Sequence, residues 1–162
     1  MASVVSLFIS PAIGEPMEAR ASVRALAGRG LEGDRYALGQ GSYSKLPRPV
    51  ARHVSLIARE AMEAANEELI RRGLIPFEPE ETRRNIVVEG VDVYELLGQE
   101  FRVGAIRLRG SAPTRPCHIS SAAANKTGFA EAYHDRGGIR AEVLSDGVIS
   151  IGHLILADVL PR

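Results

Sequence analysis

The sequence predicts a mostly β domain of the α+β class, with a closed or partly open β-barrel and a few short peripheral helices. Many short apolar segments are separated by glycine-rich turns, only two or three segments have helical spacing, and regular strand-helix alternation is absent. A barrel is favoured because closure removes exposed strand edges. The length of 162 residues is that of one domain, so we interpret residues 1–162 as a single unit.

The first half of the chain is expected to contain three strands, a long loop and the longest helix. Val4–Ile9 is apolar, and Met17–Ala25 alternates apolar and polar residues, which is typical of a half-buried strand. The segment 28–49 is rich in Gly, Ser and Pro and predicts a loop. Val54–Ile57 is interpreted as a buried strand that leads into a helix over Ala58–Arg72.

The second half is expected to form short elements separated by glycines. In chain order these are a strand at Ile86–Val88, one or two helical turns at Val91–Leu97, a strand pair or bent strand around Gly104 at Phe101–Leu108, a helix near Gly128–His134, and strands at Ile139–Leu144, Val148–Ile151 and Leu154–Leu160. Asp146-Gly147 predicts a hairpin turn between the first two of these last strands.

Composition limits the classes of partner. The 20 basic and 20 acidic residues balance, so no overall field favours nucleic acid or an anionic membrane. The longest apolar stretches, including Val148–Val159, are shorter than the roughly 20 residues of a membrane span, and no basic segment precedes Val4–Ile9 as in a signal peptide. The single cysteine suits a reducing compartment. We therefore expect a soluble, cytoplasmic protein.

The segment Gly28–Gly33 satisfies the spacing G-x-G-x-x-G, which in dinucleotide-binding proteins precedes a helix. Here Asp34-Arg35-Tyr36 and further glycines and prolines follow, which is incompatible with an amphipathic helix. We expect no nucleotide site. The segment is either an ordinary surface loop or a loop that carries Asp34 and Arg35 to the mouth of a barrel.

Cys117 is the strongest candidate for chemistry, because a thiol is both a soft metal ligand and a nucleophile. Pro116 favours an extended backbone, so Arg115 and Cys117 are expected to project to the same face, where the guanidinium could stabilise a thiolate. His118 could supply a second positive charge or transfer a proton. Cys117, Arg115 and His118 are thus the candidate catalytic residues; the alternative is an inert, buried cysteine.

Arg83-Arg84-Asn85 follows an acidic run and precedes an apolar strand. These residues either form surface salt bridges or clamp an anion at the end of the strand. The chain has no H-x-x-x-H or H-E-x-x-H motif, and a single cysteine excludes a zinc site built from cysteines.

Taken together, several segments resemble the MOSC domain, the carboxy-terminal domain of molybdenum cofactor sulfurases. The resemblance runs over nearly the whole chain. The segments that carry it are Gly30-Leu31-Glu32-Gly33-Asp34-Arg35-Tyr36, Thr82-Arg83-Arg84-Asn85-Ile86-Val87-Val88-Glu89-Gly90, Phe101-Arg102-Val103-Gly104, Arg115-Pro116-Cys117 and Gly137-Gly138-Ile139-Arg140-Ala141-Glu142-Val143.

The resemblance implies a β-barrel-like fold and a cysteine that carries persulfide sulfur or ligates molybdenum, which makes Cys117 the functional thiol and metal ligand. It also implies that Asp34, Arg35, Arg84 and Asn85 lie near the pterin phosphate or the metal oxo group of the molybdenum cofactor. Pyridoxal phosphate is not expected, because neither lysine lies in a Schiff-base context.

Two alternatives remain beside a sulfur-transfer role. One is a non-catalytic module that binds the pterin cofactor or docks on a partner enzyme. The other is a molybdenum-dependent reductase of N-hydroxylated compounds, which requires a separate redox partner because the sequence contains no electron-transfer centre. In the sulfur-transfer interpretation the expected partner is a sulfur donor protein.

Overall fold

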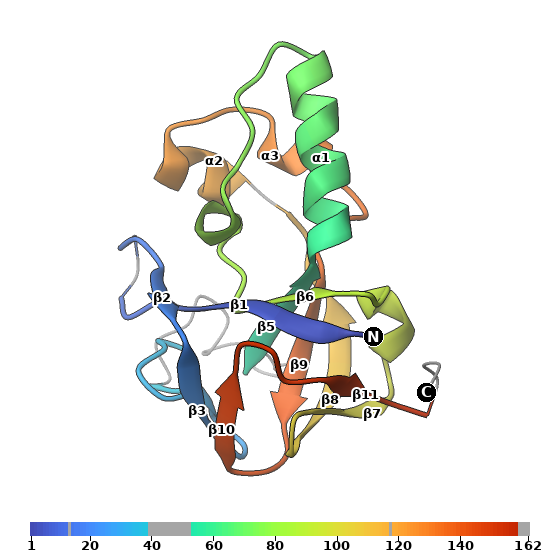
Figure 1. Cartoon of the computed structure of the whole chain (residues 1–162). Helices are drawn as coiled ribbons and strands as arrows, with labels where there is room; N and C mark the ends of the chain where they lie inside the picture. Colours follow the sequence, from blue (N-terminus) through green and yellow to red (C-terminus); the bar gives the residue numbers. More distant parts are fainter. Residues whose placement is uncertain (13, 39–52, 117, 159–162) are drawn as a thin grey trace.

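The computed structural model describes residues 1–12, 14–38, 53–116 and 118–158. Strands dominate, and they curl into a partly open barrel with helices gathered at one end (Figure 1). This confirms the predicted mostly β fold with few short helices.

The larger of two sheets has eight strands in the order β11-β7-β8-β9-β5-β6-β1-β2, and the smaller has the order β10-β3-β4. The strands are β1 (Ser3–Ile9), β2 (Glu18–Arg20), β3 (Ser22–Leu26), β4 (Gly30–Leu31), β5 (Val54–Ala58), β6 (Ile86–Glu89), β7 (Glu100–Val103), β8 (Ile106–Pro113), β9 (Ile139–Val143), β10 (Gly147–Ser150) and β11 (Ile155–Leu156). Among the strands described, β5 and β6 pair in parallel and the other neighbours are antiparallel.

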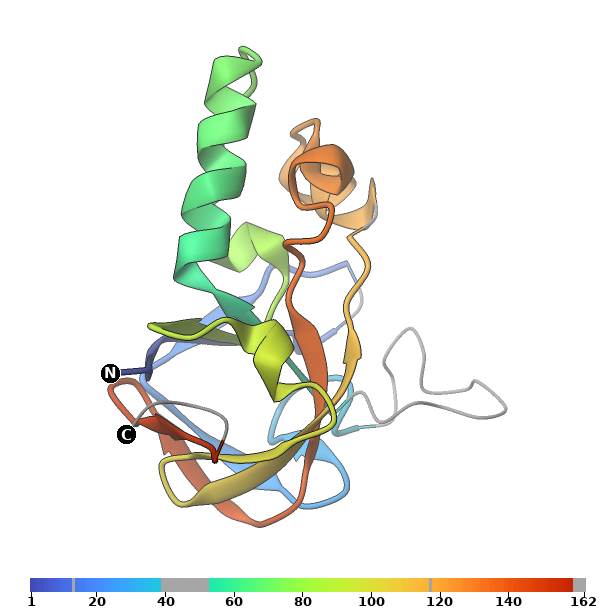
Figure 2. The ribbon, with the colours of Figure 1, turned by 90° about the vertical axis from the view of Figure 1, so that its right-hand side faces the viewer.

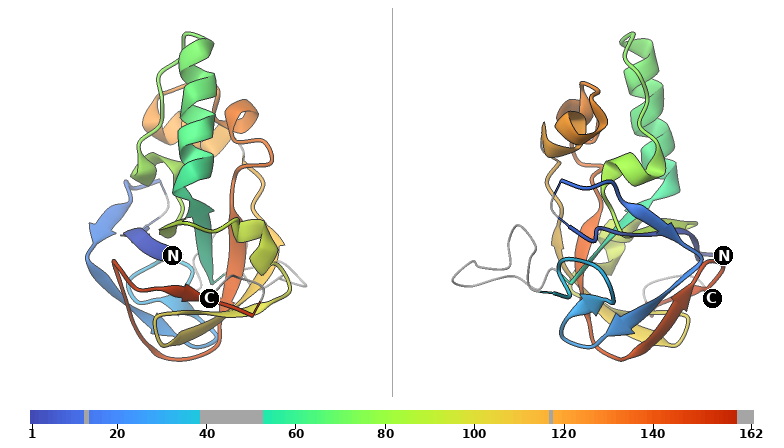
Figure 3. Two further views of the ribbon diagram at one scale, coloured as in Figure 1. Left: turned by 45° about the vertical axis from the view of Figure 1, so that its right-hand side comes forward. Right: turned by 90° about the vertical axis from the view of Figure 1, so that its left-hand side faces the viewer.

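Apolar side chains from both sheets fill the barrel. In β7 and β8 alternate residues are buried, as the period of two along a strand requires; Phe101, Val103, Ile106 and Leu108 are examples. The two ends of the described chain meet at the barrel wall, where the Ile155 N–H donates to the Ala2 carbonyl at 2.9 Å (Figure 3).

The helical layer covers one end of the barrel, and the β3 and β10 strands lie toward the other end (Figure 2). The helical layer consists of α1 (Arg59–Arg71), the 3₁₀ helix η1 (Pro79–Thr82), α2 (His118–Ala124) and α3 (Phe129–Ala132). A second 3₁₀ helix, η2 (Val93–Leu96), leads into β7. Phe77, Phe129 and Tyr133 pack their rings together beneath α1 and form the centre of a second apolar cluster.

The helix α1 is the longest described and lies within one residue of the predicted bounds at each end. Met62, Ala65 and Leu69 are buried on one face. The helix ends where Gly73 adopts a φ of +72° and the Leu74 N–H donates to the Leu69 carbonyl at 2.8 Å.

Two sequence predictions about the strands need correction. Met17–Ala25 is not one strand: the chain changes sheet at Ala21, so that β2 pairs with β1 and β3 pairs with β10 and β4. The turn at Asp146-Gly147 does not form a hairpin, because β10 pairs with β3 while β9 pairs with β5 and β8. An apolar period identifies a strand but not its partner.

The helices α2 and η1 had no counterpart in the sequence prediction. Residues 39–49 of the predicted loop and 159–160 of the last predicted strand lie outside the described residues. Among the described residues, no helix is long and apolar enough to cross a membrane.

Candidate functional site

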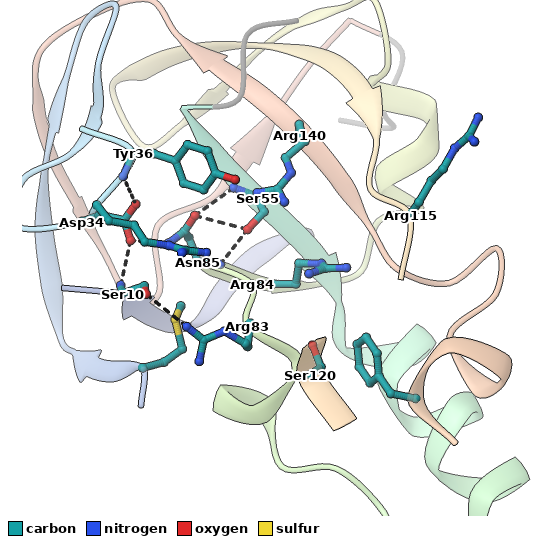
Figure 4. Close-up of a pocket in the computed structure, with 13 residues that line it drawn as sticks. Ser10, Asp34, Tyr36, Ser55, Arg83, Arg84, Asn85, Arg115, Ser120 and Arg140 are labelled. Atoms are coloured by element: carbon teal, nitrogen blue, oxygen red, sulfur yellow. Dashed lines mark hydrogen bonds between the residues drawn. The ribbon is translucent and has the colours of Figure 1, made fainter. Parts of the chain in front are cut away.

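A pocket opens where the ends of β1, β5, β6 and β8 meet the helical layer (Figure 4). The described residues that line it are Ser10, Met17, Asp34, Arg35, Tyr36, Ser55, Arg83, Arg84, Asn85, Arg115, Ser120, Phe129 and Arg140. Five of these are arginines, and Asp34 is the one carboxylate among them. The pocket therefore presents a strongly positive surface.

The wall of the pocket is built on a buried network centred on Asn85. Its Oδ1 accepts from the backbone N–H and the hydroxyl of Ser55, at 3.0 and 3.2 Å, and its Nδ2 donates to the Phe8 carbonyl at 3.1 Å. The same Nδ2 donates to Asp34 Oδ1 at 3.2 Å. Asn85 thus ties β1, β5 and the segment after β4 together.

Asp34 is almost fully buried beside Asn85 and accepts three hydrogen bonds. Besides the Asn85 amide, the Ser10 N–H donates to Oδ1 at 2.7 Å and the Tyr36 N–H donates to Oδ2 at 3.2 Å. Burial raises the pKa of the Asp34 carboxyl, although these donors and the charge of Arg35 oppose the shift. The carboxylate holds the segment 34–36 against the end of β1.

Arg84 is buried and held by two carbonyls. Its Nε donates to the Gly137 carbonyl at 2.7 Å and its guanidinium donates to the Thr82 carbonyl at 3.2 Å. The Thr114 hydroxyl donates to the same Gly137 carbonyl. This carbonyl therefore links Arg84 to the end of β8, from which the segment containing Cys117 continues.

The adjacent Gly138 shows why this turn needs glycine. Its φ is +89°, and a Cβ there would lie 2.0 Å from the Leu56 carbonyl oxygen of β5. The absence of a side chain allows the start of β9 to approach β5 closely, with the Gly138 N–H donating to the Tyr94 hydroxyl at 3.1 Å.

Arg83 and Tyr36 also line the pocket. Arg83 has a left-handed backbone with φ +60°, unusual for a residue other than glycine, and donates to the Glu15 carbonyl and the Ser10 hydroxyl at 3.1 and 3.2 Å. The Tyr36 ring has the guanidinium carbon of Arg35 5.6 Å and that of Arg140 5.4 Å from its centroid.

The structure brings the predicted residues Asp34, Arg35, Arg84, Asn85 and Arg115 to this one pocket. Arg115 is at its exposed edge and extends away from the other labelled side chains in Figure 4.

Cys117 lies outside the described residues. His118 begins α2, but its side chain also lies outside the description. In the sequence Cys117 stands between two pocket residues, two positions after Arg115 and three before Ser120. The roles assigned to Cys117, Arg115 and His118 stay predictions.

Sequence reasoning missed Ser10, Ser55, Tyr36, Ser120 and Arg140 as pocket residues. Arg140 belongs to the quoted segment that begins Gly137-Gly138, and Tyr36 directly follows Asp34-Arg35, so both carried a signal. Ser55 interrupts the apolar run of a buried strand, a place where a polar residue needs a partner. No pattern in the sequence indicated that Ser10 or Ser120 would line the pocket.

The chemistry of the lining fits an anionic ligand. Guanidinium groups bind phosphate and carboxylate oxygens through paired hydrogen bonds. Within the described part of the chain, no group of three or more His, Cys, Asp or Glu side chains forms a metal site.

Comparisons with known proteins agree with the fold. The YuaD protein of Bacillus subtilis is similar in structure with a TM-score of 0.73 and 17% identity, over 94% of this chain and 93% of that protein. YiiM from Geobacillus stearothermophilus matches with a TM-score of 0.68 and 17% identity, over 100% of this chain and 76% of the other. For YiiM from Escherichia coli the TM-score is 0.65 at 17% identity, over 99% and 72%.

No curated protein sequence matches the chain. The MOSC domain family matches residues 32–155, a range that includes the segments 34–36 and 83–85 and the Gly137-Gly138 turn described above. The chain belongs to the MOSC domain family.

Proposed function

We propose that this protein acts in molybdenum cofactor or sulfur-transfer chemistry and that the arginine-lined pocket binds the anionic pterin cofactor. The observation that carries the proposal is the set of five arginines around one buried carboxylate in a chain of the MOSC family. A pocket of this charge attracts a phosphate or an oxo group strongly and repels cations.

The residues present fit such a group. Arg84 is fixed by two carbonyls before any ligand arrives, so its guanidinium is oriented in advance. Arg35 also lines the pocket, with its guanidinium carbon 5.6 Å from the centroid of the Tyr36 ring. Asp34 and Asn85 hold the segments that carry these arginines. When bound, the cofactor would supply a redox-active metal centre.

Cys117 is the proposed thiol of the site, either as a molybdenum ligand or as the carrier of persulfide sulfur. Its support is its place in the sequence, between pocket residues Arg115 and Ser120. Arg115 and His118 are proposed to favour the thiolate, because nearby cationic groups lower a cysteine pKa. A sulfur donor protein would load the thiol; a reductase function would need a separate redox partner.

Metal analysis, pterin analysis and intact mass, measured on protein from a molybdenum-replete host, test the proposal. We expect molybdenum with pterin, or one additional sulfur on the chain. Arg84→Gln should reduce the cofactor content, Cys117→Ser should abolish persulfide or molybdenum loading, and Arg29→Gln, at an exposed position outside the pocket, should change neither.

Absence of molybdenum, pterin and added sulfur from the wild-type protein would contradict the proposal. Loading that is unchanged in Cys117→Ser would remove Cys117 from the site and leave a pocket that binds the cofactor without the thiol.

A further inference from the structure

A groove with a volume of about 810 Å³ lies along β7 and β11. These strands are at the side of the barrel, apart from the helices α1, α2 and α3 (Figure 2). The groove shares none of its described lining residues with the arginine-lined pocket. It is therefore a separate surface, to which the proposed cofactor chemistry gives no role.

Strand pairing places an exposed leucine and two arginines in one row of this surface. Leu156 of β11 is the register partner of Arg102 in β7, and Arg102 is the register partner of Arg107 in β8. All three side chains are exposed, whereas the neighbouring Phe101 and Ile155 are buried in the barrel. The two arginines face each other across the strands, and like charges in that arrangement repel.

The ion pairs of this surface leave one arginine and one carboxylate without a partner. Glu100 binds Arg109 at 2.9 Å and lies 4.0 Å from Arg107. The side chains of Arg102 and Asp158 form no hydrogen bond or ion pair with any described residue. Both line the groove, and Asp158 follows Leu156 by two residues. The surface thus presents two free charges of opposite sign beside an exposed leucine.

Exposed apolar side chains concentrate in the segment that forms one wall of the groove. Val148, Ile151, Leu154 and Leu156 belong to β10, β11 and the turn between them, and each is between 38% and 49% exposed. A single exposed apolar residue is ordinary, but a concentration of them is typical of an interaction surface.

We propose that this surface is an interface between two copies of the chain, related by a twofold axis that passes beside Leu156. In a twofold interface each contact occurs twice, so Arg102 of either copy binds Asp158 of the other while the two Leu156 side chains pack together. A nucleic acid, an anionic membrane or an acidic peptide would need positive charge alone, whereas the groove carries equal numbers of arginines and carboxylates. A surface with both signs of charge is complementary to itself.

Sedimentation velocity of the full chain over a concentration series tests the interface. We expect a reversible dimer with twice the chain mass of 17.5 kDa. Arg102→Asp and Asp158→Arg each bring like charges together across the axis and should raise the dimer dissociation constant by at least about tenfold. The double variant exchanges the two charges and should restore the constant to within about threefold of the wild-type value. Leu156→Glu should abolish the dimer.

Ile75→Glu is the matched control, because it introduces the same charge at an aliphatic residue that is 64% exposed outside the groove. It should leave the dissociation constant within about twofold. Circular dichroism verifies that each variant is folded. Since all the substituted side chains except Arg102 and Asp158 are apolar, the exchange of these two charges also separates a lost contact from a lost fold.

The interface is overturned if the chain sediments as a monomer throughout, if either charge variant dimerises like the wild-type protein, or if the double variant fails to restore the dimer. A dimer weakened by Ile75→Glu and not by Leu156→Glu would assign the contact to another surface and would also overturn it. So would a monomer whose groove holds a small molecule in native mass spectrometry. None of these outcomes depends on molybdenum loading.

Discussion

The substitution Asn85→Asp replaces one donor group at the centre of the pocket wall with a carboxylate oxygen. In the wild-type protein Asn85 Nδ2 donates to the Phe8 carbonyl at 3.1 Å and to Asp34 Oδ1 at 3.2 Å, while Oδ1 binds Ser55. The substitution keeps the contacts with Ser55. It leaves two buried acceptors facing an oxygen that cannot donate to them.

The expected cost follows from what each of those two acceptors retains. Asp34 Oδ1 keeps the Ser10 N–H as a donor, whereas the Phe8 carbonyl is left without one, which costs about 1–3 kcal/mol. Repulsion between the new carboxylate and Asp34 adds to this cost, so we expect a loss of at least about 1–3 kcal/mol in the free energy of unfolding. For a chain of this size, each kcal/mol lowers the melting temperature by about 2–4 °C. The loss should depend on pH, because the introduced carboxylate and Asp34 form a like-charged pair.

The sign of this pH dependence follows from the negative charges of the introduced carboxylate and Asp34. Repulsion raises the pKa of the pair in the folded state above its unfolded value, so the folded variant binds a proton more readily than the unfolded chain. Stability is therefore regained as the pH falls from 8 to 5. Urea unfolding followed by far-ultraviolet circular dichroism measures it, since the chain has no tryptophan.

The matched control is Asn125→Asp, which makes the same chemical change at an exposed residue with a φ of +53° that aspartate tolerates. Its effect should stay within about 0.5 kcal/mol. The reasoning would be refuted if Asn85→Asp cost no more than this control, or if its cost were the same at pH 5 and pH 8.

Three further predictions concern the turn beside the pocket, a histidine and the thiol. Gly138→Ala should destabilise the fold by more than about 2 kcal/mol, because its Cβ would lie 2.0 Å from the Leu56 carbonyl oxygen; thermal unfolding measures this, and a neutral substitution would contradict the close approach. Burial lowers the pKa of His53 from its ordinary value of 6.5, and its Nδ1 accepts from the Val143 N–H at 2.9 Å. Stability should thus be full above pH 6.5 and fall on acidification, and His53→Gln should flatten that slope in urea unfolding. Alkylation of Cys117 by iodoacetamide should be fast at neutral pH; a thiol that reacts only after unfolding would be structural.

The sequence alone correctly predicts the helices and strands whose pattern depends only on neighbouring residues. The helix predicted over Ala58–Arg72 and the strand structure predicted over Phe101–Leu108 depend on residues a few positions apart, and both are present as α1 and as β7 with β8. Strand pairing is not local: β10 binds β3, more than a hundred residues earlier, and no period in the sequence carries that information. The short helix α2 is held by its contacts with α3 and η1 rather than by a long amphipathic pattern.

The candidate site was also predictable in part. The residue types of Arg83-Arg84-Asn85 left open either surface salt bridges or an anion clamp at a strand end, and the structure brings these residues to one pocket with Asp34 and Arg35. The separate structural roles of these residues were not predictable, since only the folded chain shows that the Asn85 amide forms hydrogen bonds with Ser55, Phe8 and Asp34. Asn85 therefore supports the wall of the pocket and also lines it.

Hydrogen-deuterium exchange tests most directly whether the arginine-lined pocket is the cofactor site. Protein from molybdenum-replete cells would be compared with protein from cells that cannot make the cofactor. The account predicts slower exchange in the loaded protein for peptides that contain residues 34–36, 83–85 and 118–120. Slower exchange confined to the separate groove lined by Phe101, Arg102 and Ile155, with molybdenum present, would contradict it.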